Sequence, residues 1–390
     1  MKILHTGDWH LGARLGSQDR VIDQMDRLEE IAGVLDSEEV DLLLVAGDVF
    51  DEHRTEDLGK VLARLARLLT PRIEAGLSAI FVAGNHDREH VFPLLRSLQD
   101  LVSPGEARRV IFAQHPCIEV VTSPKGESLQ LLLLPYPTPF RYDLADERWP
   151  APDAKRTALA SAVRERLNYL KKKAAGERLP TILCGHLLIR GASGGSYELT
   201  EQEDILLESG DLPSYSYVAL GHIHKAQQVG VPHFRYCGSI ERMDRGEAQD
   251  EKSVTLVEVR QSGLDDVNEV PLDATPFADL TASSEAELEA AANQLKDVDR
   301  TLVYLTLEIK GEQSVGSIQA MAKRLFKRMY RPPEIRWLDK PVETRPNIST
   351  ERADVGATVR AYLKEALLND PDRDALLSLA DELLKEKELT

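Results

Sequence analysis

MKILHTGDWH, residues 1–10, opens with a short β-rich run and passes at once into glycine, aspartate and histidine. Four later apolar runs end in the same way, in a glycine followed by residue types that bind metal ions. The five polar segments are Gly7 to His10, Gly47 to Asp51, Gly84 to Asp87, Gly185-His186 and Gly221 to His224. In open α/β folds, ligands bind outside the carboxyl ends of the strands. These segments are therefore predicted to converge on one crevice, although they are far apart in the sequence.

The residues in these segments offer carboxylate, amide and imidazole groups, a mixture that suits manganese, iron or zinc rather than calcium. The potential ligands are Asp8, His10, Asp48, Asn85, His186, His222 and His224. This set is too large for one tetrahedral ion, and it fits two ions if one carboxylate bridges them. Two ions about 3.5–4 Å apart clamp the attacking and leaving oxygens of an in-line phosphoryl displacement.

Each segment alone is weak evidence for such a site. An Asp-x-His pair such as Asp8 and His10 occurs by chance, and Gly47-Asp48 alone is typical of a turn. His222 and His224 are stronger, because alternate residues of an extended segment lie on the same side and can chelate one ion. The prediction rests on all five segments occurring in order, each at the end of an expected strand.

The first two thirds of the chain alternate β-rich apolar runs with helical patterns, which predicts an α/β layered domain. The expected strands are 2–5, 41–46, 79–83, 129–134, 181–184, 217–220 and 253–259, and the expected helices are 19–37, 55–69, 90–101 and 155–174. A small α+β domain is expected at 274–340, with helices 285–295 and 317–330 and strands 301–309 and 334–337. A polar linker and two amphipathic helices, 353–368 and 373–384, are expected within 341–390.

Charge and composition narrow the class of protein. The chain has 48 Lys and Arg against 65 Asp and Glu, a net charge of -17, which argues against a polyanion partner unless basic residues gather locally. The 3 cysteines form no CxxC pair, so neither a disulfide framework nor a zinc ribbon is expected. The longest apolar runs are far shorter than the ~18 residues of a membrane span. With no signal segment recognisable before Asp8, a cytoplasmic protein is expected.

The ordered motifs resemble the calcineurin-like metallophosphoesterases, and within them the nuclease subunits that act with an SbcC-type ATPase in DNA repair. The resemblance covers residues 1 to about 270 and is carried by MKILHTGDWH, GDVFD at 47–51, VAGNHD at 82–87, ALGHIHKAQ at 219–227 and RYCGSIERM at 235–243. It implies a four-layer α/β fold in which two β-sheets lie between layers of helices. The catalytic domain would be 1–273, and 274–340 would be the family's small capping domain.

The resemblance also implies roles for the motif residues. One manganese ion would be bound by Asp8, His10, Asp48 and His224, and a second by Asp48, Asn85, His186 and His222, with Asp48 as the bridge. His86 would contact the scissile phosphate and assist departure of the leaving oxygen, and Asp87 would orient the ring of His86, as a general acid requires. Relatives from other kingdoms can have a phosphate-handling histidine at the position of Asp51, whose role here stays open.

Three further segments are expected to contact other molecules. Basic residues at helical spacing in the small domain are predicted to contribute to duplex DNA binding, and these are Lys323, Arg324, Lys327, Arg328 and Arg331. The apolar segment 90–101 is typical of a core helix, but the resemblance implies dimerisation in this region, so a homodimer is expected. The terminal helices must bury an apolar face, and the resemblance implies that they dock on the SbcC-type ATPase.

The leading hypothesis is a manganese-dependent DNA nuclease subunit, a 3′–5′ exonuclease on duplex ends and an endonuclease on single strands or hairpins, acting in break and hairpin processing. One alternative is a phosphoesterase for small substrates such as nucleotides, or for phosphoproteins. The basic helix, the extra domain and the terminal helices argue against it. Another alternative is a non-catalytic platform with the same fold. The intact polar set argues against a platform, because burying such groups without metal is costly.

Overall fold

The structure is a computed structural model. It describes residues 1–51, 58–102, 109–145, 147–192, 205–208, 210, 212, 215–310, 315–338, 362–364, 373–374 and 376–380. The chain divides into two compact units, one formed by Met1–Glu308 with Gln313–Arg336 and the other by Ile309–Glu312 with Trp337–Thr390. The first unit contains a large body with two six-stranded sheets and a small sheet that follows it in sequence.

The first sheet of the body contains the N-terminal strand at its centre. Its order is β16 (Gly263–Leu272), β15 (Lys252–Arg260), β1 (Lys2–Thr6), β4 (Leu42–Val45), β5 (Ser78–Val82) and β6 (Val110–Ala113). Strands β1, β4, β5 and β6 are parallel to one another, whereas β15 is antiparallel to both β1 and β16. The carboxyl ends of β1, β4 and β5 therefore meet at one edge of the sheet.

The second sheet has the same number of strands and a parallel centre. Its order is β13 (Gln227–Val229), β14 (Val231–Tyr236), β12 (Tyr217–Gly221), β9 (Thr181–His186), β8 (Ser128–Leu134) and β7 (Cys117–Thr122). Strand β9 pairs in parallel with both β12 and β8, and Gly221 lies opposite His186 in the register of β12 and β9. Two short two-stranded ladders, β2 (Arg14–Leu15) with β3 (Gln18–Asp19) and β10 (Leu188–Ile189) with β11 (Leu206–Leu207), complete the body.

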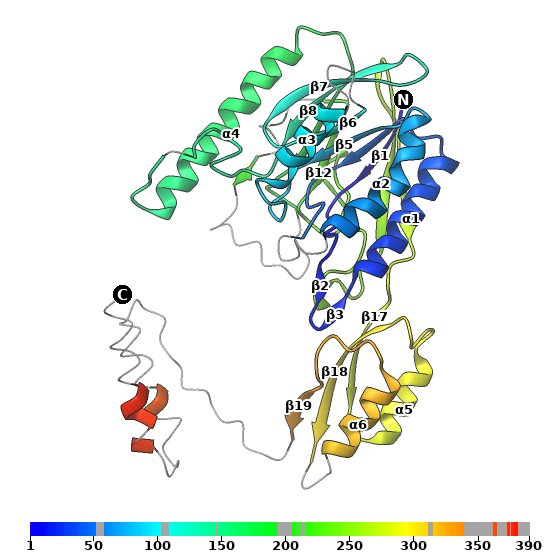
Figure 1. Cartoon of the computed structure of the whole chain (residues 1–390), viewed down its shortest axis with the longest axis vertical. Helices are drawn as coiled ribbons and strands as arrows, with labels where there is room; N and C mark the ends of the chain where they lie inside the picture. Colours follow the sequence, from blue (N-terminus) through cyan, green and yellow to red (C-terminus); the bar gives the residue numbers. More distant parts are fainter. Residues whose placement is uncertain are drawn as a thin grey trace. The chain divides into compact units, whose positions relative to one another are not determined.

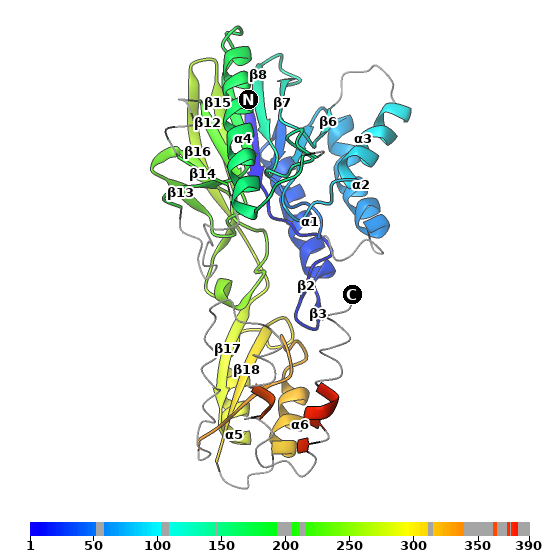
Figure 2. The same ribbon diagram turned by 90° about the vertical axis from the view of Figure 1, so that its left-hand side faces the viewer.

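Helices cover the outer faces of the two sheets, which confirms the predicted four-layer α/β fold. Helices α1 (Val21–Ser37), α2 (Leu58–Glu74) and α3 (Val91–Val102) lie on the first sheet, and α4 (Pro152–Ala174) lies on the second (Figures 1 and 2). One apolar core lies between the first sheet and its helices, another between the second sheet and α4, and a third between the two sheets. Both faces of the central strands are buried, which explains their near-continuous aliphatic sequences.

The small sheet of the first unit has the order β17 (Phe277–Ala282), β18 (Leu302–Ile309) and β19 (Glu334–Trp337), accompanied by α5 (Glu285–Gln294) and α6 (Val315–Leu325). The predicted helix at 317–330 is wrong at its C-terminal end. After Leu325 the chain leaves the helix, Phe326 is buried, and Met329 forms a parallel bridge with Val303 of β18. Pairing with the sheet therefore overrides the amphipathic pattern that continues past Leu325.

Other expectations fall partly or wholly outside the described residues. Of the predicted C-terminal helices, only 362–364, 373–374 and 376–380 are described, and these are helical. The predicted start of α2 at residue 55 also lies outside them. The boundaries at 273 and 340 remain predictions. Within the described parts of the chain, helices long and apolar enough to cross a bilayer are absent.

Candidate metal centre

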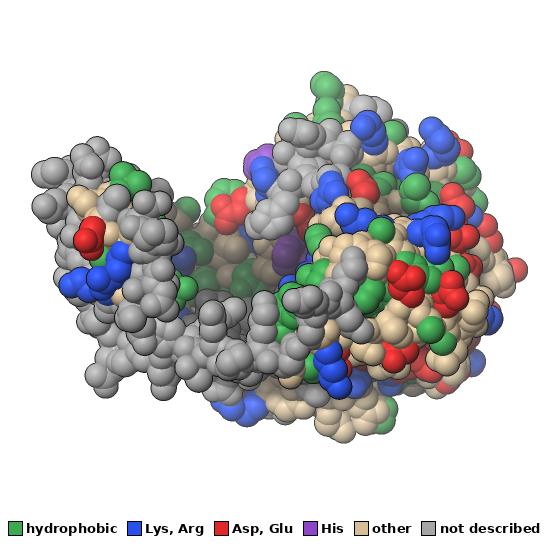
Figure 3. Space-filling view, turned by 90° about the horizontal axis from the view of Figure 1, so that it is seen from below, with side chains coloured by type: hydrophobic (Ala, Val, Ile, Leu, Met, Phe, Trp, Pro, Cys, Tyr) green, Lys and Arg blue, Asp and Glu red, His purple; other side chains and the backbone are tan. Residues whose placement is uncertain are grey.

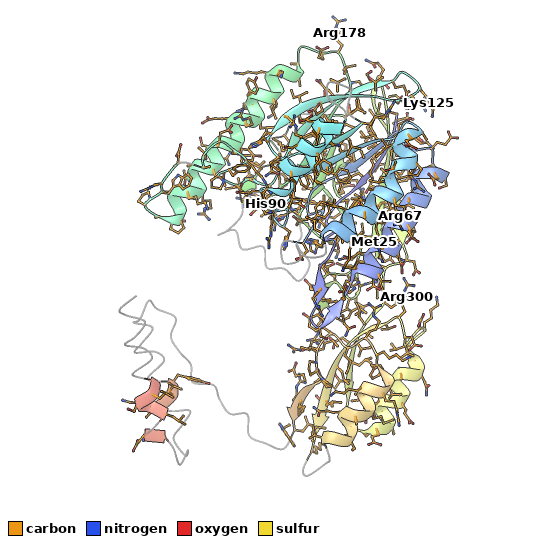
Figure 4. The ribbon with its side chains drawn as sticks, in the orientation of Figure 1. Met25, Arg67, His90, Lys125, Arg178 and Arg300 are labelled. Atoms are coloured by element: carbon orange, nitrogen blue, oxygen red, sulfur yellow. The ribbon has the colours of Figure 1, made fainter. Side chains whose placement is uncertain are left out.

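The five predicted segments meet at one end of the body. Segments after β1, β4 and β5 come from the first sheet, and those at the ends of β9 and β12 come from the second. His90, three residues past the segment that follows β5, lies toward this end, whereas Arg178, shortly before β9, lies at the opposite end of the body (Figure 4). The five segments therefore converge in the structure, as predicted.

Several non-glycine residues at this end of the body have backbone conformations that are uncommon for their residue types. Asp8, His10, Asp48 and His222 have positive φ angles of 47°, 44°, 49° and 100°. Such angles are uncommon outside glycine and store strain that the surrounding structure must offset, and they cluster at functional sites. The four potential ligands are therefore held in place by the two packed sheets and not by local preference.

Two glycines allow the segments to approach one another. A Cβ on Gly47 would lie 2.1 Å from His186 Nδ1, and a Cβ on Gly84 would lie 2.1 Å from Asp48 Oδ1. Gly47 also has a φ of +98°. These two glycines are thus needed for contact between the ligand-bearing segments themselves.

The first group of potential ligands contains Asp8, His10 and His224. One ligand atom from each lies within 4.8 Å of those of the other two. His10 Nε2 lies 3.1 Å from His224 Nε2, and the Asp8 carboxylate accepts the backbone N–H of His222 at 3.0 and 3.1 Å. Two imidazole nitrogens directed at each other beside a buried carboxylate fit a divalent cation between them.

The second group is built around Asp48 and His186. His186 Nε2 lies 3.3 Å from Asp48 Oδ2 and 2.8 Å from Asn85 Oδ1, and His222 Nδ1 lies 3.1 Å from the same Asn85 oxygen. Asp48 Oδ2 also lies 3.6 Å from His10 Nε2. The Asp48 carboxylate therefore lies between the two groups, at the position that a bridging ligand requires.

His10 and Asp48 have protonation states that suit metal binding, whereas His186 must lose a proton when an ion binds. Burial would lower the pKa of His186, but Asp48, by its charge and hydrogen bond, raises that pKa to about 9. Burial lowers the pKa of His10 to about 3 against the opposing charge of Asp48, so the imidazole is neutral at pH 7. Burial would raise the pKa of Asp48, but His186, by its charge and hydrogen bond, holds that pKa well below its usual range. Ionised carboxylate and neutral imidazole are the forms in which these side chains bind metal ions.

His86 lies at the edge of the site, half-buried, with its ring centroid 4.7 Å from that of His10. Its backbone N–H donates to Asp48 Oδ1 at 2.8 Å, while its buried Nδ1 atom has no hydrogen-bond partner among the described residues. A ring atom of His86 also lies within 4.8 Å of ligand atoms of His10 and Asp48. The ring is therefore close enough to reach a molecule bound beside the ligands.

The expectation that Asp87 orients the ring of His86 is wrong. The Asp87 carboxylate accepts backbone N–H groups of Gly84, Phe50 and Val49 at 2.8, 2.9 and 3.2 Å. Burial, followed by the charge of Asp48, raises the pKa of Asp87 to about 6. Asp87 therefore joins the segments after β4 and β5. Asp51, whose role was left open, is half-buried, and its backbone N–H donates to the Leu11 carbonyl at 3.1 Å.

The basic residues of the small domain do not form one helical face. Only Lys323 and Arg324 lie on α6, where both are exposed. Lys327 pairs with Asp299 at 2.8 Å, Arg331 pairs with Glu334 at 2.9 Å, and Arg328 donates to Asp23 of α1 at 3.0 Å. In the view of Figure 3, Lys and Arg side chains are likewise interspersed with Asp and Glu.

Three buried charged residues that support the site lie outside the five predicted segments. Glu247 accepts a hydrogen bond from His224 Nδ1 at 2.7 Å, and Lys252 pairs with Glu247. Burial would raise the pKa of Glu247, but the hydrogen bond from His224 and the charges of His224 and Lys252 hold it at about 2. Arg141, 1% exposed, donates to the carbonyls of Gly84 and Asp87. Local sequence gives no signal for these contacts.

The fold and this site together define a metal-dependent phosphoesterase. Residues 1–226 match the calcineurin-like phosphoesterase family, and the chain belongs to that family. It is similar to the SbcD subunit of the nuclease SbcCD of Escherichia coli (strain K12), with 27% identity over 360 residues, 89% of this chain and 87% of that protein. The proteins of the same name from Rhodobacter capsulatus and Bacillus subtilis are 28% and 27% identical, over 82% and 67% of this chain and 83% and 66% of theirs.

Proposed function

We propose that this protein is a manganese-dependent DNA nuclease subunit that acts in the cytoplasm with an SbcC-type ATPase in double-strand break and hairpin processing. The activities would be 3′–5′ exonuclease on duplex ends and endonuclease on single strands and hairpins. The observation that carries the proposal is the meeting of five strand-end segments, from two sheets, around Asp48. The names of the similar proteins supply the substrate and the partner.

The position of each side chain supports a particular role in the reaction. Asp8, His10, Asp48 and His224 would hold one ion, and Asp48, Asn85, His186 and His222 the other. When bound, the pair of ions would supply activation of the attacking water and charge stabilisation at the phosphate. His86 would deliver a proton to the leaving oxygen, and the contacts of Asp87 and Arg141 would hold the His86 segment in place.

A homodimer is also proposed, and α3 supports it. Phe92 is fully buried, whereas Leu94, Leu98 and Leu101 are 55%, 50% and 77% exposed. The segment whose sequence is typical of a core helix is therefore buried on one face only. A two-fold contact through this face would bury these leucines and place two metal centres in one assembly.

The proposed activity is tested by incubating the full chain and Mn²⁺ with linear duplex DNA and, separately, with a chromogenic phosphodiester. We expect hydrolysis of the small ester by the chain alone, weak duplex cleavage, and strong cleavage once an SbcC-type ATPase and ATP are added. Cleavage of the ester alone, even with the partner present, would support a small-substrate phosphoesterase. Inactivity toward both substrates under every condition would support a non-catalytic platform.

DNA binding by the small domain is proposed for Lys323 and Arg324, since both are exposed on α6. Each phosphate contact contributes about 0.9 to the slope of log affinity against log salt. Replacing both residues by glutamine should therefore reduce that slope by about two. The slope is measured by fluorescence anisotropy with duplex DNA and without divalent ions, so that the DNA stays intact.

A matched control changes the same number of charges elsewhere. Lys172 and Lys173 are exposed near the C-terminus of α4, so their double glutamine variant has the same net charge as the double variant of α6. We expect the α4 variant to keep the wild-type slope. Equal slopes for both variants would show that α6 has no specific part in binding.

A further inference from the structure

Glu247 and Lys252 form a buried charged pair behind His224, on the side of the ring away from His10. Glu247 belongs to a short 3-10 turn, Arg245–Glu247, and Lys252 is the first residue of β15. They are only 5% and 3% exposed. We propose that this pair positions His224 for metal binding by fixing which ring nitrogen carries the proton. The inference rests on the metal centre of the proposed function and adds a residue pair that controls it.

Both carboxylate oxygens of Glu247 accept hydrogen bonds. Oε1 accepts from His224 Nδ1 at 2.7 Å, and Oε2 accepts from Ser239 Oγ at 3.1 Å and from the Met243 N–H at 3.2 Å. Lys252 Nζ donates to the same Oε2 atom and also to Ser239 Oγ and the His224 carbonyl. With donors on both sides, the carboxylate cannot turn away from the ring.

This arrangement determines the tautomer of His224. An ionised carboxylate only accepts hydrogen bonds, so Nδ1 of His224 must carry the proton that it donates to Glu247. In the neutral ring Nε2 then keeps its lone pair, and Nε2 is the atom that lies 3.1 Å from His10 Nε2. Carboxylates behind ligand histidines fix ring orientation and raise the basicity of the ligand nitrogen in this way.

In the second group of ligands, the acceptor behind His186 is a backbone carbonyl and not a carboxylate. The Glu247–Lys252 pair therefore acts on His224 and not on His186. His186 Nδ1 donates at 2.8 Å to the backbone carbonyl of Ala46, a neutral acceptor. Lys252 explains why a carboxylate can occupy the position behind His224, because an isolated buried carboxylate is costly whereas a paired and hydrogen-bonded one is tolerated. Removing Lys252 alone would leave Glu247 without its counter-ion.

Glu247→Gln separates the charge from the shape of the side chain. Three donors surround the Oε2 position, so the amide oxygen is expected there, and the amide N–H₂ must then face His224 Nδ1. A donor at that place favours the opposite tautomer, with the proton on Nε2. In the metal-free proteins, at a pH where the His224 ring is neutral, ¹⁵N NMR should show this proton on Nδ1 in the wild type and on Nε2 in the variant. Affinity for Mn²⁺, measured by calorimetry, should fall roughly 10- to 100-fold.

The double variant Glu247→Gln with Lys252→Met distinguishes two roles of the pair. The pair either positions His224 for metal binding or only stabilises the fold. It removes both buried charges, so we expect a melting temperature close to that of the wild type. Ser239 and the Met243 N–H still favour oxygen at the Oε2 position, so the altered tautomer and the weak Mn²⁺ affinity should persist.

Two results would overturn the proposal: wild-type Mn²⁺ affinity in the double variant, or an unchanged His224 tautomer in Glu247→Gln. Neither measurement uses DNA or the ATPase. Failure of this inference is therefore distinguishable from failure of the proposed nuclease activity.

Discussion

Asp48→Asn is expected to abolish Mn²⁺-dependent hydrolysis while leaving a folded protein. Asp48 Oδ2 lies 3.3 Å from His186 Nε2 and 3.6 Å from His10 Nε2, so its carboxylate lies between the two sets of ligands. An asparagine keeps an acceptor for the His86 N–H but cannot bridge two cations. Loss of the two-ion clamp removes several kcal/mol of transition-state stabilisation, and about 4 kcal/mol corresponds to roughly 10³-fold in rate.

The measurements for Asp48→Asn are hydrolysis of the chromogenic ester and the number of Mn²⁺ ions bound per chain by calorimetry. We expect binding of at most one ion together with the loss of rate. Asp41→Asn is the matched control, because Asp41 is a buried carboxylate at the opposite end of β4 that accepts the Lys2 N–H and lies outside the groups of potential metal ligands. Two ions bound by Asp48→Asn at wild-type affinity would contradict the bridging role.

His86→Gln should leave metal binding intact and reduce DNA cleavage by about 10²–10⁴-fold, the contribution typical of a general acid. The reason is chemical, since the alkoxide leaving group of DNA needs a proton as its bond to phosphorus breaks. The nitrophenolate leaving group does not need such a proton. Hydrolysis of a nitrophenyl phosphodiester should therefore fall much less than cleavage of DNA.

This comparison also tests the alternative that the geometry leaves open for His86. A ring atom of His86 lies within 4.8 Å of ligand atoms of His10 and Asp48, so the ring could itself be a ligand. Loss of a bound ion from His86→Gln, with equal loss of activity on both substrates, would assign that role to it. His90→Gln, at an exposed histidine four residues later, is the control and should behave as wild type.

The central strands and the ligand segments could be predicted from sequence for one physical reason. Strands buried on both faces have continuous aliphatic sequences, and polar residues directly after them are conspicuous. The four edge strands of the two large sheets, β6, β7, β13 and β16, are absent from the prediction, and so is the partly exposed β14 beside β13. Edge strands are partly solvated, as in β16, where Asp265, Asp266 and Glu269 are exposed. Their mixed composition is hard to distinguish from that of loops.

The missed parts of the site depend on contacts between distant segments. Glu247 lies in the acidic and basic run DRGEAQDEK at 244–252, which is typical of a solvated loop, yet its side chain reaches His224. Arg141 likewise supports residues more than fifty positions away. The small-domain helix was extended too far because Phe326 to Tyr330 keep a helical pattern although the chain turns there to pair with Val303.

The position of β1 at the centre of the first sheet has a consequence for how the protein is made. Its neighbour on one side, β4, leaves the ribosome early, but its neighbour on the other side, β15, consists of residues 252–260. His222, His224 and Glu247 are also translated long after Asp8 and His10. During most of its synthesis, the nascent chain therefore contains Asp8 and His10 but not yet β15, the second neighbour of β1. The metal centre is completed only when the body as a whole has been synthesised, so an unfinished chain lacks part of its ligand set.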